Sequence, residues 1–159
     1  MIKQIEIIRK TRAFLLKNLE DLTTEQYNKI PDGFNNNIIW NLGHMVAAQQ
    51  GVCYIRAGLA SRVGEDIIAL FKSGTKPERS FSEAEIENIK TLLSSTLDQL
   101  EEDYNNGIFS GYTAWSTRYD VELAGIGDAI NFLPFHEGLH SGCIGALKRL
   151  VKLSSVAGY

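Results

Sequence analysis

Three histidines are the side chains of this sequence whose type and spacing point most directly to chemistry: His44, His136 and His140. His136 and His140 are four residues apart, so on a helix they share one face about a turn from each other. That spacing lets both imidazoles reach a single metal ion. Three neutral imidazoles on one ion leave a coordination position open, which is the arrangement of catalytic rather than structural zinc sites.

The surroundings of the histidines suggest that they point inward. His44 lies in an apolar stretch with helical spacing, and the face that carries His136 and His140 also holds Phe132, Cys143 and Leu147. Buried polar groups need partners. One metal ion satisfies three imidazoles at once, whereas a single buried histidine is more often held by a hydrogen bond, and the spacing alone leaves both arrangements open. Cys143, one turn after His140, is a candidate fourth ligand, although we favour core filling for it.

Residues 136–140 also match the His-Glu-x-x-His pattern of zinc peptidases. Those enzymes usually take a third ligand from downstream, but residues 141–159 contain no His, Asp or Glu. The rest of the chain shows no strand pattern that would present a peptide, so we regard peptidase activity as the less favoured alternative. Glu137 is a candidate catalytic residue, as a general base or as a group that orients a metal ligand. The alternative, which we favour slightly, is an exposed helix acid.

Helices must position these side chains. Apolar residues at helical spacing, with Arg12 on the first stripe, predict four helices over about 2–21, 37–58, 83–104 and 128–152. They indicate a single all-α domain over residues 1–159, a four-helix bundle. Residues 59–81, with one short helix at most, are long enough to run the length of the bundle. The sequence therefore favours long crossover connections over a simple up-and-down order.

Local signals sharpen the expected helix ends. Ser82 with Glu85 forms a capping box, and Thr23 with Gln26 forms another before a short extra turn. Asparagines 35–37 offer N-caps, and Gly58 offers a C-cap. Pro134, two residues before His136, predicts a kink or a late helix start.

Composition excludes several classes of protein. Hydrophobic residues make up 44% and charged residues 22% of the chain, which excludes intrinsic disorder. The net charge of −3 and pI near 5.6 argue against nucleic-acid binding. We expect no membrane span and no signal peptide, because no apolar run is long enough. The two cysteines lie in helical apolar patterns, so we expect a reducing, cytoplasmic setting.

Two segments together resemble the DinB-like superfamily over essentially the whole chain. They are Trp40-Asn41-Leu42-Gly43-His44 and Phe135-His136-Glu137-Gly138-Leu139-His140-Ser141-Gly142, with a Gly127-Asp128 lead-in. The resemblance implies up-down-down-up helix order and a divalent metal bound by His44, His136 and His140. Some members are thiol-dependent S-transferases that act on small molecules, which implies Zn²⁺ or Ni²⁺ and a low-molecular-weight thiol cosubstrate. The resemblance also implies a homodimer.

The sequence leaves two classes of function open. The first is a metal-dependent enzyme, a thiol transferase in which Arg118, Tyr112 and Trp115 of the 105–126 connection cover the pocket and Arg118 meets a carboxylate of the cosubstrate. For the aromatic residues we favour the alternative that they cap the end of the core. The second class is a non-catalytic stress-related or interaction protein with a structural or vestigial metal site. Many members of the family have no assigned reaction, so a shared fold does not decide between the two classes.

Overall fold

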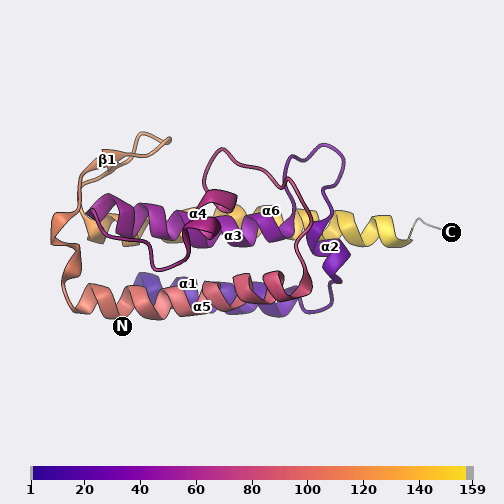
Figure 1. Ribbon diagram of the computed structural model, residues 1–159, viewed down its shortest axis with the longest axis horizontal. Coiled ribbons are helices and arrows are strands. Elements are labelled where there is room, and N and C mark those ends of the chain that lie inside the picture. The colour runs from indigo at the N-terminus through magenta and orange to yellow at the C-terminus, as the bar shows by residue number, and fades with distance from the viewer. Residues whose placement is uncertain (1, 157–159) are drawn as a thin grey trace.

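Helices dominate this computed structural model, which describes residues 2–156 (Figure 1). Within that range the α-helices are α1 (Lys3–Asn18), α2 (Thr24–Asn28), α3 (Ile38–Gln49), α4 (Glu65–Phe71), α5 (Glu83–Asn105) and α6 (Ile126–Val156). A π-helical segment, η1 (Gln50–Tyr54), and two 3₁₀ turns, η2 (Ile55–Ala57) and η3 (Ile108–Gly111), complete the helical part. The mostly helical class predicted from the sequence is confirmed.

The predicted caps set the helix ends. Thr23 and Gln26 form a capping box before α2, and Ser82 and Glu85 form another before α5. The Asn37 side chain accepts a hydrogen bond from the amide of Trp40 and starts α3. The predicted helix over 37–58 is interrupted, since α3 continues as η1 and η2 before Gly58 ends it in the left-handed conformation (φ 71°).

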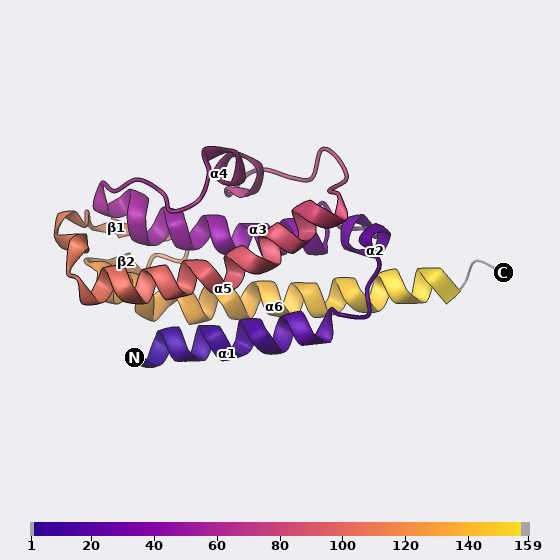
Figure 2. The ribbon, with the colours of Figure 1, turned by 60° about the horizontal axis from the view of Figure 1, so that its bottom comes forward.

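The two helices at the ends of the chain run in parallel. Arg12 in the middle of α1 contacts Glu137 of α6. Asp21, which follows the end of α1, pairs with Lys152, which lies further along α6 than Glu137. Residue numbers therefore rise in the same direction along both helices. Figures 1 and 2 show this pair running left to right, from the N-terminus toward the C-terminus.

The two middle helices also run in parallel, in the opposite direction to α1 and α6. Gln49 of α3 bonds Thr96 of α5, and Tyr54 in the extension of α3 bonds Asp103 near the end of α5. In Figures 1 and 2 both helices run right to left. This direction is possible because residues 58–82, with α4 among them, return along the bundle before α5 begins.

The second long connection, between α5 and α6, contains two strands that were not predicted from the sequence. β1 (Trp115–Ser116) and β2 (Glu122–Leu123) form an antiparallel hairpin with Trp115 opposite Leu123. Each strand has only two residues, too few to produce a period-two pattern in the sequence. The hairpin projects on the same side of α3 and α6 as α4 (Figure 1).

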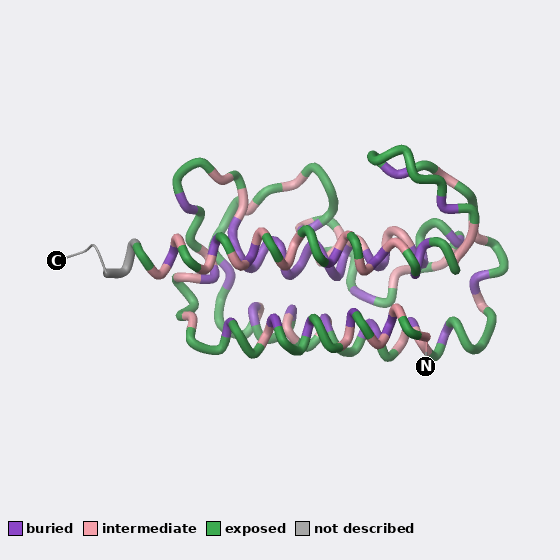
Figure 3. Tube along the Cα trace, turned by 180° about the vertical axis from the view of Figure 1, so that it is seen from behind, coloured by how far each residue is buried: buried purple, intermediate pink, exposed green. Residues whose placement is uncertain are grey.

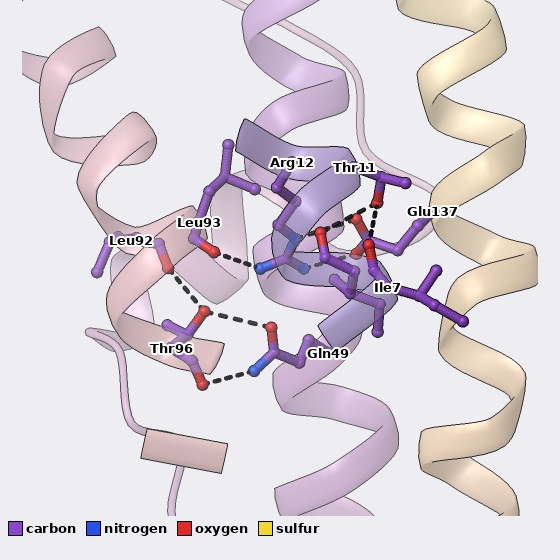
Figure 4. Close-up of polar contacts among 9 residues, drawn as sticks. Ile7, Thr11, Arg12, Gln49, Leu92, Leu93, Thr96 and Glu137 are labelled. Atoms are coloured by element: carbon purple, nitrogen blue, oxygen red, sulfur yellow. Dashed lines mark hydrogen bonds and ion pairs between the residues drawn. The ribbon is translucent and has the colours of Figure 1, made fainter. Parts of the chain in front are cut away.

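Two apolar clusters fill the bundle. The buried inward faces of the long helices appear as purple stripes in Figure 3. One cluster includes Leu15, Val46, Leu93 and Ile144, and the other includes Ile8, Cys53, Leu97 and Leu133. On each of the four long helices a buried polar residue lies between members of the two clusters: Arg12, Gln49, Thr96 and Glu137. These four residues, the polar layer, separate the two clusters, and Figure 4 shows their hydrogen bonds and the ion pair.

The start of α6 excludes one of the two outcomes expected for Pro134, the late helix start, while a kink at this position stays a prediction. α6 begins at Ile126, so Pro134 lies inside it and a late helix start is wrong. The start is set upstream, where the Asp128 carboxylate accepts a hydrogen bond from the Ala124 amide at 2.9 Å. Proline removes one amide donor, which a helix held by tertiary packing tolerates.

Candidate metal centre

α3 and α6 bring the three histidines together. One nitrogen of each of His44, His136 and His140 lies within 4.8 Å of the others. The ring centroids are 4.7 Å apart for His44 and His140, 5.3 Å for His44 and His136, and 4.6 Å for His136 and His140. The i, i+4 pair on α6 and the single histidine on α3 therefore form one cluster that could hold a metal ion.

The His44 ring is fixed from two sides. Its Nδ1 lies 2.7 Å from the Phe71 carbonyl oxygen, which only accepts hydrogen bonds, so Nδ1 carries the proton and Nε2 keeps its lone pair. Trp40 stacks on the other side of the ring at 4.8 Å and 9°, and its Nε1 donates to Thr75. A backbone acceptor behind a metal-binding histidine sets its tautomer and orientation.

Asn41 does the same for His140. The Nδ1 of His140 lies 2.8 Å from Oδ1 of Asn41. The Asn41 amide nitrogen donates to the Asn37 carbonyl and to Asn36 Oδ1, which fixes the amide so that its oxygen faces the histidine. His140 therefore donates through Nδ1, and its Nε2 is free to bind a ligand.

The third ring gives a direct test of whether the cluster suits a metal. The Nδ1 of His136 is buried and has no hydrogen-bond partner among the residues that the structure describes. Leaving such an atom without a partner costs desolvation free energy, so its presence calls for an explanation such as an ion. Three imidazoles, two of them oriented by acceptors, are a donor set that suits Zn, Ni, Cu or Fe. The residues present fit a divalent ion.

The electrostatics of the cluster keep the imidazoles neutral. Burial is the main cause of a lowered pKa in all three, because it disfavours the charged form. The pKa of His136 falls to about 3 and that of His140 to about 4, with repulsion from neighbouring histidines adding to the effect of burial. Arg118 lowers all three pKa values further. Neutral imidazole is the form that binds a metal.

We predict that these lowered pKa values make the metal-free protein sensitive to mild acid. An unfolded histidine has a pKa near 6.5 and takes up a proton that the folded cluster excludes, so the free energy of unfolding falls as pH drops below about 6.5. Each histidine contributes at most about 1.4 kcal/mol per pH unit. Urea denaturation at about pH 7.5, 6.5 and 5.5 measures this loss. His140→Gln should reduce the slope, and equal stability at all three pH values would contradict the prediction.

Gly43 is required by the close approach of Phe71. A Cβ at position 43 would lie 2.5 Å from the Phe71 ring, the residue whose carbonyl holds His44. We predict that Gly43→Ala lowers the free energy of unfolding by about 1–3 kcal/mol and weakens metal binding. Gly138→Ala is the control, because its Cβ meets nothing within 4 Å and it should stabilise α6 by about 0.5–1 kcal/mol. Denaturation and metal titration of both variants check this, and equal behaviour would count against it.

Glu137 is not the exposed helix acid that we favoured from the sequence. It is 2% exposed and forms a two-pronged ion pair with Arg12, at 3.0 Å from Nε and 2.6 Å from Nη2 (Figure 4). Arg12 also donates to the Leu93 carbonyl at 2.7 Å. The expectation failed because Glu137 turns from the histidine face toward α1, where it meets a buried cation. The Arg12 guanidinium engages both carboxylate oxygens of Glu137, which opposes a general-base role and with it the peptidase alternative.

The three residues predicted to line a pocket separate into two groups. Arg118 acts electrostatically on all three histidines and donates to Ser73 Oγ at 3.0 Å. Tyr112 and Trp115 bond each other, and Arg56 lies 4.3 Å over the Trp115 ring. Tyr112 also packs against the second apolar cluster, as expected for an aromatic residue that caps the core. A thiol-binding role for Tyr112 and Trp115 stays a prediction.

Cys143 packs against the first apolar cluster, as favoured from the sequence, and burial raises its pKa. Within residues 2–156, it does not belong to the group of potential ligands. The roles of Asn41 and Phe71 were not predicted from the sequence. Asn41 carried a signal, since it is a polar residue in an apolar run one turn before His44. Phe71 acts through its backbone, which leaves no trace in residue type.

Comparison with known proteins identifies a family whose match includes the three histidines. The family model described as the DinB superfamily matches residues 7–144, a stretch that includes all three histidines. A comparison with curated proteins finds no match. Among the described residues, no helix has the length and apolar character needed to span a membrane.

Proposed function

The chain belongs to the DinB superfamily, and on this premise we propose that it is a metal-dependent thiol S-transferase. His44, His136 and His140 would hold a divalent ion, Zn²⁺ or Ni²⁺. The observation that carries the proposal is the convergence of three neutral imidazoles whose ligand nitrogens lie within 4.8 Å of one another. The parallel pairing of α1 with α6 and of α3 with α5 supports the up-down-down-up bundle that the family resemblance implies.

The residues around the cluster orient the imidazoles for this task. A divalent ion held by three imidazoles supplies Lewis acidity that lowers the pKa of a bound thiol or water. Phe71 and Asn41 accept the Nδ1 protons of His44 and His140, which raises the basicity of the opposite nitrogens. Trp40 covers one face of His44 and excludes water from it. In the transfer itself, the thiol loses its proton to solvent and its sulfur bonds to an electrophilic carbon, from which the leaving group departs with the bonding electrons.

A comparison of metal-loaded and metal-free protein tests the proposal. The assay follows thioether formation between low-molecular-weight thiols and 1-chloro-2,4-dinitrobenzene, with the release of chloride. We expect the protein loaded with Zn²⁺ or Ni²⁺ to accelerate the reaction, chelation to abolish the acceleration and the same ion to restore it. Acceleration that survives complete removal of the metal would contradict the proposal. A protein that binds metal but accelerates the reaction of no thiol would favour the non-catalytic alternative.

A further inference from the structure

Arg118 lies in the turn at the tip of the β1–β2 hairpin, and hydrogen bonds within this turn fix its conformation. The Thr117 amide donates to the Val121 carbonyl at 2.9 Å, and the Asp120 amide donates to the Thr117 carbonyl at 3.0 Å. The Thr117 hydroxyl, which is buried, accepts further hydrogen bonds from the amides of Tyr119 and Val121. Arg118 therefore projects from a braced turn, although its own side chain is exposed.

Two contacts place this tip beside the histidines. Arg118 Nη2 donates to Ser73, two residues after Phe71, whose carbonyl orients His44. On the other side, the Tyr119 ring lies 5.2 Å from Phe135 and 6.5 Å from Phe132, both on the turn of α6 that leads into His136. The hairpin tip thus contacts α6, which carries two of the histidines, and the segment after α4, whose Phe71 carbonyl orients the third. The guanidinium lowers the pKa of all three imidazoles, which agrees with this position.

Arg118 has no carboxylate partner among the residues that the structure describes. Arg9, Arg12, Arg62 and Arg79 each pair with a carboxylate. Within the described part of the chain, no carboxylate pairs with Arg118, and its one hydrogen-bond partner is the neutral Ser73 hydroxyl. A guanidinium has five N–H donors in a fixed fork that matches a carboxylate. Most of these donors are available to a ligand, since one hydrogen bond to Ser73 is the only one that Arg118 makes among the described residues.

We propose that Arg118 is a specificity-determining residue that binds a carboxylate of the molecule held at the three histidines. The substrate class is accordingly a small acid, either a thiol or an electrophile that carries a carboxylate. This inference rests on the proposed function, because it assigns a ligand chemistry to the same site. Ser73 holds the guanidinium in place, and the hairpin fixes its distance from the cluster.

Paired thiols test the proposal without an activity assay. The full-length protein is loaded with Co²⁺ and titrated with 3-mercaptopropionate or with the neutral 2-mercaptoethanol, and the thiolate-to-Co²⁺ charge-transfer band reports binding. We expect the acid to bind about tenfold more tightly. Arg118→Gln should remove this preference, so that the two thiols bind with similar affinity. Arg149→Gln, at an exposed arginine near the end of α6, is the matched control and should keep the preference.

The outcomes separate the two proposals. If both thiols give the band and the preference for the acid persists in Arg118→Gln, the carboxylate binds elsewhere, for example to the metal, and the role of Arg118 is overturned. Equal affinities in the wild-type protein overturn it as well. If the protein binds Co²⁺ but neither thiol gives the charge-transfer band, the result contradicts the S-transferase function. It then also contradicts the role of Arg118, which rests on that function.

Discussion

Replacing Arg12 by methionine should lower the free energy of unfolding by about 3–5 kcal/mol, a large part of the stability of a domain of this size. The variant leaves the Glu137 carboxylate, which is 2% exposed, without its cation in the core. It also leaves the Leu93 carbonyl without the donor that Arg12 provides at 2.7 Å. A methionine fills much of the arginine volume, so the loss measures charge rather than a cavity. Urea denaturation followed by circular dichroism gives the value.

Two controls separate this buried pair from ordinary surface charges. Arg9→Met removes a partly exposed pair with Asp98 and Glu101 and should cost less than about 1 kcal/mol. The double variant Arg12→Met, Glu137→Leu removes both buried charges and should recover most of the loss, because apolar pairs often replace buried ion pairs without cost. If Arg12→Met and Arg9→Met behave alike, the polar layer is not a structural feature of the core.

The fold was largely predictable because its signals are local. Apolar spacing and capping residues such as Ser82 and Asn37 act within a few positions, so the four long helices and most of their ends follow from the sequence. The polar layer was not predictable, since Arg12 and Glu137 are 125 residues apart. The sequence places Arg12 on the inward apolar stripe of the first helix, but no neighbouring residue indicates that Glu137 is its partner. The two-residue strands of the hairpin were too short to be recognised.

The candidate site was predictable to the level of its three imidazoles. His136 and His140 share a helix face by spacing alone, and His44 joins them only because α3 packs against α6. The contacts that orient the rings are not local, because Asn41 is 99 residues from His140 in the sequence and Phe71 is 27 residues from His44. The backbone acceptor of Phe71 leaves no residue pattern to find, and Asn41 shows only as a polar residue in an apolar run, with nothing that indicates His140 as its partner.

Removal of a single histidine should abolish stoichiometric metal binding and metal-dependent activity. In His140→Ala two imidazoles remain, fewer than the three protein ligands of catalytic zinc sites. Asn41→Ala keeps all three ligands but leaves His140 without its acceptor, so metal affinity should fall about 10–100-fold. Isothermal titration calorimetry of each metal-free variant with Zn²⁺ gives both affinities.

The order of these effects is the informative result. We expect wild type to bind most tightly, Asn41→Ala to be intermediate and His140→Ala to be the weakest. Lys152→Ala, which removes a partly exposed pair with Asp21, should match wild type. An affinity for Zn²⁺ that His140→Ala leaves unchanged would place the bound ion outside the cluster. Unchanged circular dichroism in each variant confirms that the helices remain folded.

The most direct test of the metal centre is the metal content of the purified, reconstituted protein. The chain is stripped with a chelator, incubated with Zn²⁺ or Ni²⁺, freed of unbound ion and measured by plasma mass spectrometry. The three-histidine cluster predicts one ion per chain in the wild-type protein and essentially none in a His136→Ala, His140→Ala variant that keeps its helical circular dichroism. A metal-free wild-type protein, or equal metal content in both proteins, would contradict the assignment of His44, His136 and His140 as a metal centre.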